Sequence, residues 1–328
     1  MRILCLVPGG IGDQILFFPT LSDLQQFYPN AEIDVVVEPR SKSAYRVCKS
    51  VHDVILYDFK AQNSLADLGN LLGILRDREY EIVLSLGQRW GVGLLLWLTG
   101  IPNRIGYAGG GGEWFLTQPV PLKTEQYAAQ MYHDLLQGLE INTPCPELTV
   151  SVPKKDIEWA EAEQKRLGVP GSGYVLIHGG SSELAREKGI DKIYPVGNWV
   201  KIIQSFQQRQ PELPLVVVRG PDDDAFVQSL VNILPNLKIA KPDDIGKLAA
   251  LIAGASLMLC TDSAPMHLSV AVQTYTLALF GPTDPQKLLP TDTSLPEALR
   301  GRFVGIKSPT NKIGDIPPEK ILEQVWGG

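Results

Sequence analysis

The sequence has few residues of the kinds that build metal centres or disulfide frameworks. It contains four cysteines and four histidines in 328 residues, and no two cysteines have the CxxC spacing. Zinc sites need closely spaced cysteine or histidine ligands, and disulfide frameworks are typical of short, cysteine-rich secreted chains. We therefore expect reduced cysteines in a cytoplasmic protein. They lie at Cys5, Cys48, Cys145 and Cys260.

A long hydrophobic run is also lacking. The apolar stretch at the N-terminus is interrupted by Gly9-Gly10 and Asp13, which makes it too short for a secretory signal. The run Leu94–Leu98 is far shorter than the roughly 20 apolar residues of a membrane-spanning helix. We expect a soluble protein whose membrane contact is at most peripheral, at the inner face of the cell membrane.

The sequence has no excess of positive charge. Lys and Arg total 30 against 36 Asp and Glu, which gives a net charge of −6. Nucleic-acid-binding proteins usually carry a basic surface, so nucleic acid is not an expected partner. Hydrophobic residues make up 44% and charged residues 20% of the chain, as in an ordinary globular protein.

Strand and helix patterns alternate along the chain in two successive runs. Apolar segments such as Ile3–Val7 and Tyr174–His178 have the character of buried parallel strands, and segments of helical spacing follow them. Between the runs, residues 142–153 form a Pro-rich stretch typical of a linker. We predict an α/β protein with two Rossmann-like domains, residues 1–150 and 151–328, whose parallel sheets face a central cleft. The last helix could pack on either domain.

The most informative segment is residues 256–285, SLMLCTDSAPMHLSVAVQTYTLALFGPTDP. An apolar strand ends there at a polar turn, and a helix is predicted from Ala264. The carboxyl end of such a strand and the N-terminus of the next helix together favour a phosphate or carboxylate ligand. Asp262 or Ser263 could alternatively serve only as the N-cap of that helix.

Three segments in register resemble the heptosyltransferase-type enzymes of glycosyltransferase family 9. They are MRILCLVPGGIGDQILFFPTL, then IHGGSS with DKIYPVGNW, and finally CTDSAPMHLSVAV with LFGPTDP. The resemblance spans nearly the whole chain. It implies the GT-B fold, a nucleotide-sugar donor and a glycan or glycolipid acceptor.

The resemblance assigns a catalytic base to Asp13 of the Gly12-Asp13 pair, in the N-terminal acceptor domain, and makes Gly12 a candidate for donor binding. An acceptor hydroxyl that attacks an anomeric carbon must lose its proton, and a carboxylate can take it. Asp13 could instead only cap the helix predicted over residues 11–28.

In the family, a lysine before an aromatic-Pro pair neutralises the donor diphosphate, and Lys192 before Tyr194-Pro195 matches it. A fixed cation stabilises the charge on a leaving nucleoside diphosphate without a metal. Lys188, in the same loop, is a competing candidate.

Small residues follow the strand that ends at His178, namely Gly180, Ser181 and Ser182. They would let backbone donors approach a phosphate closely, unless they form a simple turn.

Asp262, Ser263 and His267 match the family's Asp-Thr-Gly-x-x-His segment, although Ala264-Pro265 departs from its usual glycine pattern. The match implies contacts with phosphate or sugar hydroxyls. His267 could donate to phosphate or could pack against the sheet.

The acidic run Asp222–Asp224 also has a pattern found at the metal sites of GT-A transferases. It fits the start of a helix better, because acidic residues suit the helix dipole there. The resemblance makes Asp224 a candidate for the ribose and places Asp243 near the base. We therefore expect no obligatory metal and no cofactor.

Acceptor recognition is expected in the N-terminal domain, from Arg40, Lys60, Arg89, Trp90 and the loop Gly109–Gly112. Residues 85–89 read Ser-Leu-Gly-Gln-Arg where lipopolysaccharide heptosyltransferases usually carry an Asp and a Gln. The acceptor and the donor sugar therefore stay open.

The favoured function is an inverting, metal-independent glycosyltransferase that moves a sugar, with heptose from ADP-heptose as one candidate, onto an acceptor such as lipopolysaccharide. One alternative is a nucleotide-sugar epimerase or hydrolase of the same fold. Another is a non-catalytic nucleotide-sugar-binding protein. A NAD-linked oxidoreductase is disfavoured because the first turn, GGIGDQ, lacks the GxGxxG fingerprint.

Overall fold

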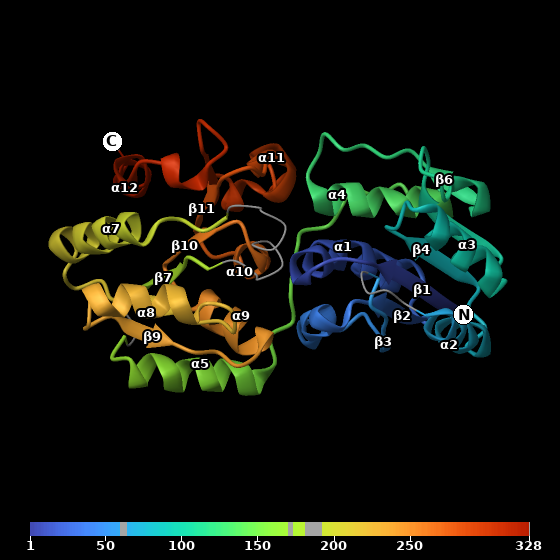
Figure 1. Cartoon of the computed structure of the whole chain (residues 1–328), viewed down its shortest axis with the longest axis horizontal. Coiled ribbons are helices and arrows are strands. Elements are labelled where there is room, and N and C mark those ends of the chain that lie inside the picture. The colour runs from blue at the N-terminus through green and yellow to red at the C-terminus, as the bar shows by residue number, and fades with distance from the viewer. Residues whose placement is uncertain (60–63, 170–172, 181–191, 328) are drawn as a thin grey trace. The chain divides into compact units, whose positions relative to one another are not determined.

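The computed structural model describes residues 1–59, 64–169, 173–180 and 192–327. The chain divides into two compact units, Met1–Ser151 and Val152–Gly328. This division falls one residue after the boundary expected from the sequence. Each unit contains one six-stranded sheet (Figure 1). All of the strand pairs are parallel, which confirms the predicted α/β class.

The first unit is built around six strands that are mostly short and apolar. These are β1 (Arg2–Val7), β2 (Glu32–Val37), β3 (Asp53–Leu56), β4 (Ile82–Ser85), β5 (Asn103–Tyr107) and β6 (Gln118–Val120). The helices are α1 (Ile11–Phe27), α2 (Leu65–Asp77), α3 (Trp90–Thr99) and α4 (Ala128–His133), with 3₁₀ helices at Pro39–Val47, Glu113–Phe115 and Asp134–Leu139. Buried side chains of α2 and α3 share a core cluster with β1, β2 and β4.

The second unit repeats this plan. Its strands are β7 (Val175–His178), β8 (Leu215–Val218), β9 (Lys238–Ala240), β10 (Leu257–Thr261), β11 (Thr276–Phe280) and β12 (Phe303–Lys307). Its helices are α5 (Lys154–Arg166), α7 (Val196–Arg209), α8 (Asp224–Ile233), α9 (Ile245–Ala253), α10 (Ala264–Ala271), α11 (Pro285–Leu288) and α12 (Pro318–Trp326), with 3₁₀ helices at Asp292–Ser294, Glu297–Leu299 and Ile313–Asp315.

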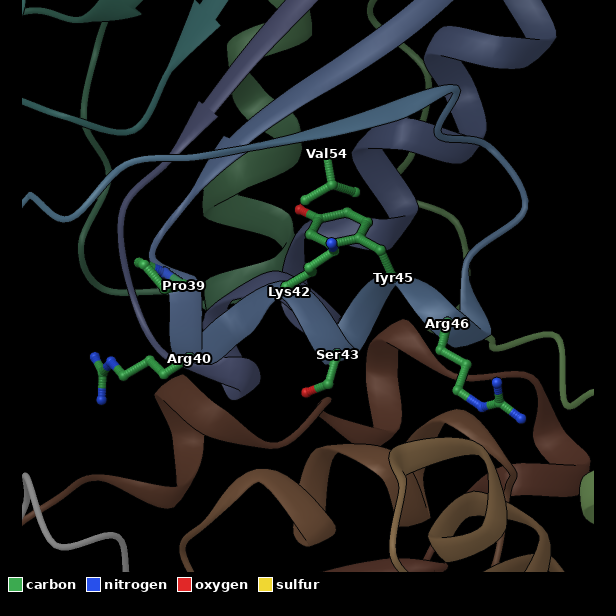
Figure 2. A pocket seen from close by; sticks show the side chains of 7 residues that line it. All are labelled: Pro39, Arg40, Lys42, Ser43, Tyr45, Arg46 and Val54. Atoms are coloured by element: carbon green, nitrogen blue, oxygen red, sulfur yellow. The ribbon is translucent and has the colours of Figure 1, made fainter. Parts of the chain in front are cut away.

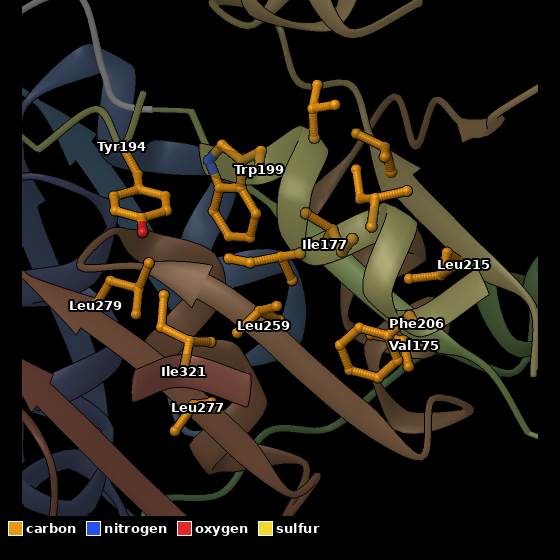
Figure 3. Close-up of a cluster of buried hydrophobic side chains, with 14 of the residues drawn as sticks. Val175, Ile177, Tyr194, Trp199, Phe206, Leu215, Leu259, Leu277, Leu279 and Ile321 are labelled. Atoms are coloured by element: carbon orange, nitrogen blue, oxygen red, sulfur yellow. The ribbon is translucent and has the colours of Figure 1, made fainter. Parts of the chain in front are cut away.

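The core of the second unit explains how α7 and α12 are held. Strand residues such as Ile177 and Leu259 pack with Trp199 and Phe206 of α7 and with Ile321 of α12 (Figure 3). These five side chains are almost fully buried, and complete burial of an apolar side chain stabilises a fold by roughly 1.5–3 kcal/mol. The last helix, whose docking the sequence left open, therefore packs within the second unit.

Both sheets have the same strand order. The sheets read β3-β2-β1-β4-β5-β6 and β12-β11-β10-β7-β8-β9, so in each the first strand of the unit lies beside the fourth. The crossovers run in opposite directions on the two sides of that point, and ligands of open α/β sheets bind at the carboxyl ends of the strands there. The topology thus selects the ends of β1 and β4, and of β7 and β10, as the places to look for a site.

Several elements differ from the sequence expectation. The residue pattern over 124–139 predicts one continuous helix, and this prediction is wrong in extent. The helix α4 covers only Ala128–His133, and a 3₁₀ helix follows it. Strands β6, β9 and β12 were not predicted at all. The strand β6 contains Pro119 and β9 begins at Lys238 and has three residues, so their sequences lack the apolar runs of central strands.

A buried carboxylate lies near the amino ends of β2 and β3. Asp34 accepts hydrogen bonds from Tyr80 (2.6 Å) and Arg78 (2.7 Å) and lies 3.0 Å from His52 Nδ1. Arg78 also donates to Asp53 at 2.7 Å. Burial alone would raise the pKa of Asp34, but these partners outweigh burial and hold the pKa below its usual value. This network ties strands of the first sheet together at the edge away from β1's carboxyl end.

Candidate functional site

Asp13 stands in the first turn of α1, directly after the loop that follows β1. Its Oδ2 accepts a hydrogen bond from the Gly10 N–H at 2.7 Å, so the capping role is real. Its Oδ1 accepts from the Tyr132 hydroxyl at 3.1 Å, and Tyr132 belongs to α4. The carboxylate is half-buried and fixed by two donors, and each oxygen keeps a lone pair for a proton. Gly12, the preceding residue, lies in the same turn.

Two neighbours are adapted to this carboxylate. A Cβ at Gly9 would lie 2.4 Å from Asp13 Oδ2, so only glycine leaves room for it. Burial raises the pKa of Tyr132 well above its usual value, and the charge of Asp13 adds to the effect. Tyr132 therefore stays protonated and remains a donor to Asp13 at any physiological pH. The role of Asp13 as a base stays a prediction.

In the second unit, the sequence-predicted donor residues meet after β10. Lys192 Nζ lies 2.6 Å from Asp262 Oδ2, and the Thr283 hydroxyl donates to the same oxygen at 2.7 Å. Asp262 is buried and Lys192 half-buried. The alternative that Asp262 caps α10 is wrong, because Ser263 is the N-cap residue and no side chain makes the cap bond.

Lys192 owes its position to Tyr194, two residues further on. The Tyr194 ring is fully buried against Trp199 at 5.4 Å between centroids (Figure 3), and its hydroxyl donates to the Ile316 carbonyl at 2.6 Å. Pro195 then starts α7 as its N-cap residue. The aromatic-Pro pair thus anchors the segment while Lys192 is left at the sheet edge.

A chain of polar side chains crosses three adjacent strands at their carboxyl ends. Ser263, after β10, has its Oγ 3.3 Å from His178 Nδ1 at the end of β7. His178 Nε2 lies 3.2 Å from Asp223 Oδ2, after β8. The Gly220 N–H donates to the same Asp223 oxygen at 2.8 Å. His178 and Asp223 are both buried, at 7% and 4% exposure.

The space for Asp223 is made by glycines. A Cβ at Gly180 would lie 1.6 Å from Asp223 Oδ1, and one at Gly220 would lie 2.8 Å from Oδ2. Burial alone would raise the pKa of Asp223, but its hydrogen bonds with His178 and the Gly220 N–H outweigh burial and keep the pKa below its usual value. Asp223 is therefore ionised at neutral pH and holds a proton on His178 Nε2.

The remaining predicted donor residues are placed as follows. Asp224 begins α8, as the helix interpretation of the acidic run predicted, and is exposed beside Arg219 at 2.7 Å. Asp243 is exposed and pairs with Lys247 at 2.7 Å. His267 is buried in α10. Ser181 and Ser182 lie outside the described residues, as does the competing Lys188.

The predicted acceptor residues do not gather into one group. Arg40 is exposed in the 3₁₀ helix Pro39–Val47 and donates to Glu38 at 2.7 Å. An open hollow of about 600 Å³ lies beside it, and Arg40 and Arg46 extend from the two ends of this helix (Figure 2). Its lining residues are Pro39, Arg40, Lys42, Ser43, Tyr45, Arg46 and Val54. Arg89 is exposed at the start of α3, and Lys60 lies outside the described residues.

The Gly109–Gly112 loop packs against the segment that carries Arg89. The Gly112 N–H donates to the Gln88 carbonyl at 3.3 Å. A Cβ at Gly93 would lie 2.6 Å from the Gly112 carbonyl oxygen. A Cβ at Gly110 of the loop would lie 2.8 Å from the Gln88 carbonyl oxygen. The close packing of the loop on the start of α3 therefore requires glycine at positions 93 and 110, a reason that the sequence did not reveal.

Three of the chain's six tryptophans stand on the surface of the first unit. Trp90 is 60%, Trp97 54% and Trp114 94% exposed. The Phe115 ring joins them, at 6.0 Å from Trp90 and 6.5 Å from Trp97 between centroids. We call these four residues the tryptophan surface. No helix among the described residues is both long and apolar enough to cross a membrane.

Sequence reasoning missed Tyr132, His178, Asp223 and Thr283. His178 ends a predicted strand and Thr283 lies in the GPTDP loop, so their places at a sheet edge could have been noted. Tyr132 carried no signal, because it lies 119 residues from Asp13. In the described part of the chain, no group of three or more His, Cys, Asp or Glu side chains could hold a metal ion.

Comparison with known proteins gives one family, and relatives whose names are of two kinds. The family model described as Glycosyltransferase family 9 (heptosyltransferase) matches residues 69–299. The "Photosynthetic NDH subunit of subcomplex B 1, chloroplastic" of Arabidopsis thaliana is 26% identical over 96% of this chain and 71% of its own. "Lipopolysaccharide heptosyltransferase 3" of Escherichia coli is 27% identical over 83% of this chain and 81% of its own.

Solved structures agree on the fold. A glycosyl transferase family 9 protein from Veillonella parvula has a TM-score of 0.80 at 19% identity, covering 99% of this chain and 96% of its own. The ADP-heptose lps heptosyltransferase II of Escherichia coli has a TM-score of 0.77 at 18% identity, covering 99% and 97%. These likenesses establish the GT-B fold.

Proposed function

The chain belongs to glycosyltransferase family 9 and is a glycosyltransferase; from that premise we propose that it is inverting and metal-independent. It takes a sugar from a nucleotide-sugar donor and passes it to a glycan or glycolipid acceptor. The observation that carries this proposal is the set of paired polar groups at the carboxyl ends of β7, β8 and β10, where an anionic donor is expected.

The second unit binds the donor in this proposal. As the glycosidic bond breaks, the leaving nucleoside diphosphate gains negative charge, and the Lys192 ammonium stabilises it. Asp262 holds that ammonium at the sheet edge and is itself held by Thr283. A lysine fixed before the substrate arrives loses little conformational freedom on binding, so more of its interaction energy serves the reaction.

The first unit supplies the base. The Asp13 carboxylate takes the proton of the acceptor hydroxyl as that oxygen attacks the anomeric carbon, a contribution of about 10²- to 10⁴-fold in rate. A single displacement of this kind inverts the configuration at that carbon. Gly10 and Tyr132 orient the carboxylate for the transfer.

The names of the relatives narrow the substrates. Three curated relatives, like the solved structure of heptosyltransferase II, are named for heptose transfer to lipopolysaccharide or for ADP-heptose. We therefore propose a heptose from ADP-heptose as the first donor to test, and a lipopolysaccharide core as the first acceptor.

Peripheral contact with a membrane is part of the proposal, and the tryptophan surface is its candidate. Tryptophan prefers the boundary between lipid and water. Three arginines border this surface: Arg89 starts α3, Arg76 donates to the Leu98 carbonyl, and Arg104 donates to the Phe115 carbonyl. Their charge is opposite to the net charge of the chain, −6, and complements anionic lipid headgroups.

Sedimentation with vesicles of phosphatidylcholine and phosphatidylglycerol tests this contact. Trp114→Ser should lower the bound fraction severalfold. Ile233→Ser, which changes an apolar residue of the second unit that is 53% exposed, should not. Equal binding of both variants, or no vesicle binding by the unaltered protein, would overturn it. The plant relative is named as a subunit of an assembly. An absence of vesicle binding by the unaltered protein would therefore favour a protein partner for this surface.

The main experiment is a donor screen by calorimetry with EDTA present, using ADP-heptose, UDP-sugars and GDP-sugars. Selective binding of one donor, followed by its turnover only when an acceptor is added, supports the proposal. Donor turnover without acceptor would favour the epimerase or hydrolase alternative. Binding without turnover under any acceptor would favour a binding protein, and a requirement for metal would refute metal independence.

A further inference from the structure

The side chains of Ser263, His178 and Asp223 form a connected polar series that does more than stabilise the fold. The three residues lie at or just after the carboxyl ends of three adjacent strands. Two glycines leave room for the Asp223 carboxylate, as their Cβ positions show. This polar series lies beside Lys192 and Asp262, where the proposed donor binds. What we infer from it rests on that proposed function.

We propose that His178, held by Asp223, is a positioning residue that directs the Ser263 hydroxyl toward a phosphate of the nucleotide-sugar donor, and that donor binding is accompanied by proton uptake at His178. The family assignment does not include this step. It follows from counting the hydrogens that the three side chains can share.

The Ser263 hydroxyl has one proton and two acceptors within reach. Its Oγ lies 3.3 Å from His178 Nδ1 and 3.2 Å from the Thr261 carbonyl. While His178 is neutral, its proton sits on Nε2 facing Asp223, so Nδ1 is a lone pair that accepts from Ser263. In this state the serine presents an oxygen lone pair, not a proton, to an incoming anion.

Protonation of His178 reverses the direction of that hydrogen bond. Nδ1–H then donates to Ser263 Oγ, and the hydroxyl proton is free to turn to a phosphate oxygen. The phosphate's own negative charge favours the imidazolium, so binding and protonation support each other. The donor should therefore bind more tightly as the pH falls.

The charged groups around His178 do not obscure this linkage. Asp223 faces Nε2 directly and is ionised near neutral pH. The Lys192–Asp262 pair, next to Ser263, is already matched in charge, and so is the exposed Arg219–Asp224 pair on the α8 side. Among these groups, His178 is therefore the one to which we assign the proton that is taken up on donor binding.

The first unit offers a matched control. His133 Nε2 lies 2.8 Å from Asp23 Oδ2, and both side chains are buried, as in the His178–Asp223 pair. The Asp23 oxygen there also accepts from Thr143, so the pair is structural. His133→Gln keeps an amide at the Nε2 position and should leave donor binding unchanged.

The test is calorimetry with the nucleotide sugar that the donor screen selects, in two buffers of different ionisation enthalpy at pH 6–8.5. A nucleotide sugar is used because its esterified diphosphate does not itself titrate there. We expect the unaltered protein to take up a measurable fraction of a proton per donor, and to bind about tenfold more weakly at pH 8.5 than at pH 6.

Two isosteric variants separate the positions of the ring. His178→Gln keeps a donor to Asp223 and loses the one to Ser263, so affinity should fall about tenfold and the pH dependence should vanish. His178→Asn keeps a donor at the Nδ1 position, so it should retain more affinity, also without pH dependence. Ser263→Ala should match His178→Gln, and the double variant should lose no more than either.

The results distinguish this inference from the proposed function. If no nucleotide sugar binds, the proposed function fails. If one binds without proton uptake, or if His178→Gln keeps the pH dependence of the unaltered protein, only this inference is overturned. Additive losses in the double variant would also overturn it, because the two residues would then act separately.

Discussion

The two units have the same strand order but carry different chemistry at the point where their crossovers change direction. In the second unit, the ends of β7 and β10 are joined by a chain of paired polar groups, and Lys192 and Asp262 neutralise each other beside it. In the first unit, a single half-buried carboxylate, Asp13, stands after β1. Topology thus determines where the site lies in each unit, and the residues in the loops after the strands determine its chemistry.

The charged networks of the two units lie at opposite ends of their strands. The Asp34 network of the first unit lies near the amino ends of β2 and β3, away from any expected ligand. The Asp223 network of the second unit lies at the carboxyl ends. We therefore expect changes in the first network to affect stability, and changes in the second to affect binding.

The largest effect should come from removing the base of the first unit. Asp13→Asn should lower the rate of sugar transfer by about 10²- to 10⁴-fold, because an amide cannot take the proton of the acceptor hydroxyl. The Asn oxygen can still accept from the Gly10 N–H, so folding and donor affinity should hardly change. Turnover and calorimetry on the same preparation check both.

Asp67→Asn is the matched control for that change. Asp67 occupies the same position in α2 that Asp13 has in α1, where its carboxylate accepts from the Ser64 N–H at 2.9 Å. A loss of turnover as large in Asp67→Asn would show that capping, and not proton transfer, explains the effect at Asp13.

The second effect concerns the ion pair of the second unit. Lys192→Met should weaken donor binding and destabilise the fold by about 3 kcal/mol, because it leaves the buried Asp262 carboxylate without its cation. Adding Asp262→Asn should restore much of the stability but not the donor affinity. Urea unfolding and calorimetry measure the two; recovery of binding in the double variant would contradict the role of Lys192.

The third effect should separate stability from activity in the first unit. Arg78→Met should cost about 2 kcal/mol of unfolding free energy at pH 7, since Asp34 keeps its burial and loses a cation. Donor affinity should stay the same. A drop in affinity would break the contrast between the two networks.

The pH dependence of that variant has a definite sign. The folded pKa of Asp34 lies below its unfolded value of about 3.9. Its stabilising contribution is therefore complete above about pH 4 and is lost as the pH falls through the folded value. The stability gap between the unaltered protein and Arg78→Met should narrow below pH 4, as urea unfolding at several pH values would show.

The smallest effect should come from the donor that orients Asp13. Tyr132→Phe removes the hydrogen bond to Oδ1 and should lower the transfer rate by about fivefold, near the 1 kcal/mol typical of one hydrogen bond. Tyr107→Phe removes a hydroxyl that donates to the Met131 carbonyl nearby and serves as the control. Equal losses in both would point to a general loosening of α4.

The sequence was most informative where a whole segment meets one structural requirement, such as burial of a strand on both faces. Buried apolar runs predicted β1 and β7 to within a residue. Motif order brought out Asp13, Lys192 and Asp262. Motif order could not show that Lys192 and Asp262 form an ion pair. The two residues are 70 positions apart, and nothing in the sequence between them indicates that the fold brings them together.

The choice among the three acidic residues also depends on contacts between segments that are distant in the sequence. The acidic run at 222–224 pointed to Asp224, but burial distinguishes the three residues, and it is Asp223 that turns inward to His178. Burial of one acid among three depends on space made by Gly180 and Gly220, which lie in the loops after two different strands, β7 and β8. That space is a property of the fold and leaves no local pattern.

Gly180 has an evolutionary consequence. Since even a methyl group there would overlap the Asp223 carboxylate, the glycine and the acid should change together among descendants of a common ancestor. A lineage that gains a side chain at position 180 should also have a smaller residue at 223, and with it a histidine that no longer has a counter-ion. Laboratory evolution of new sugar preferences should therefore vary both positions in the same library.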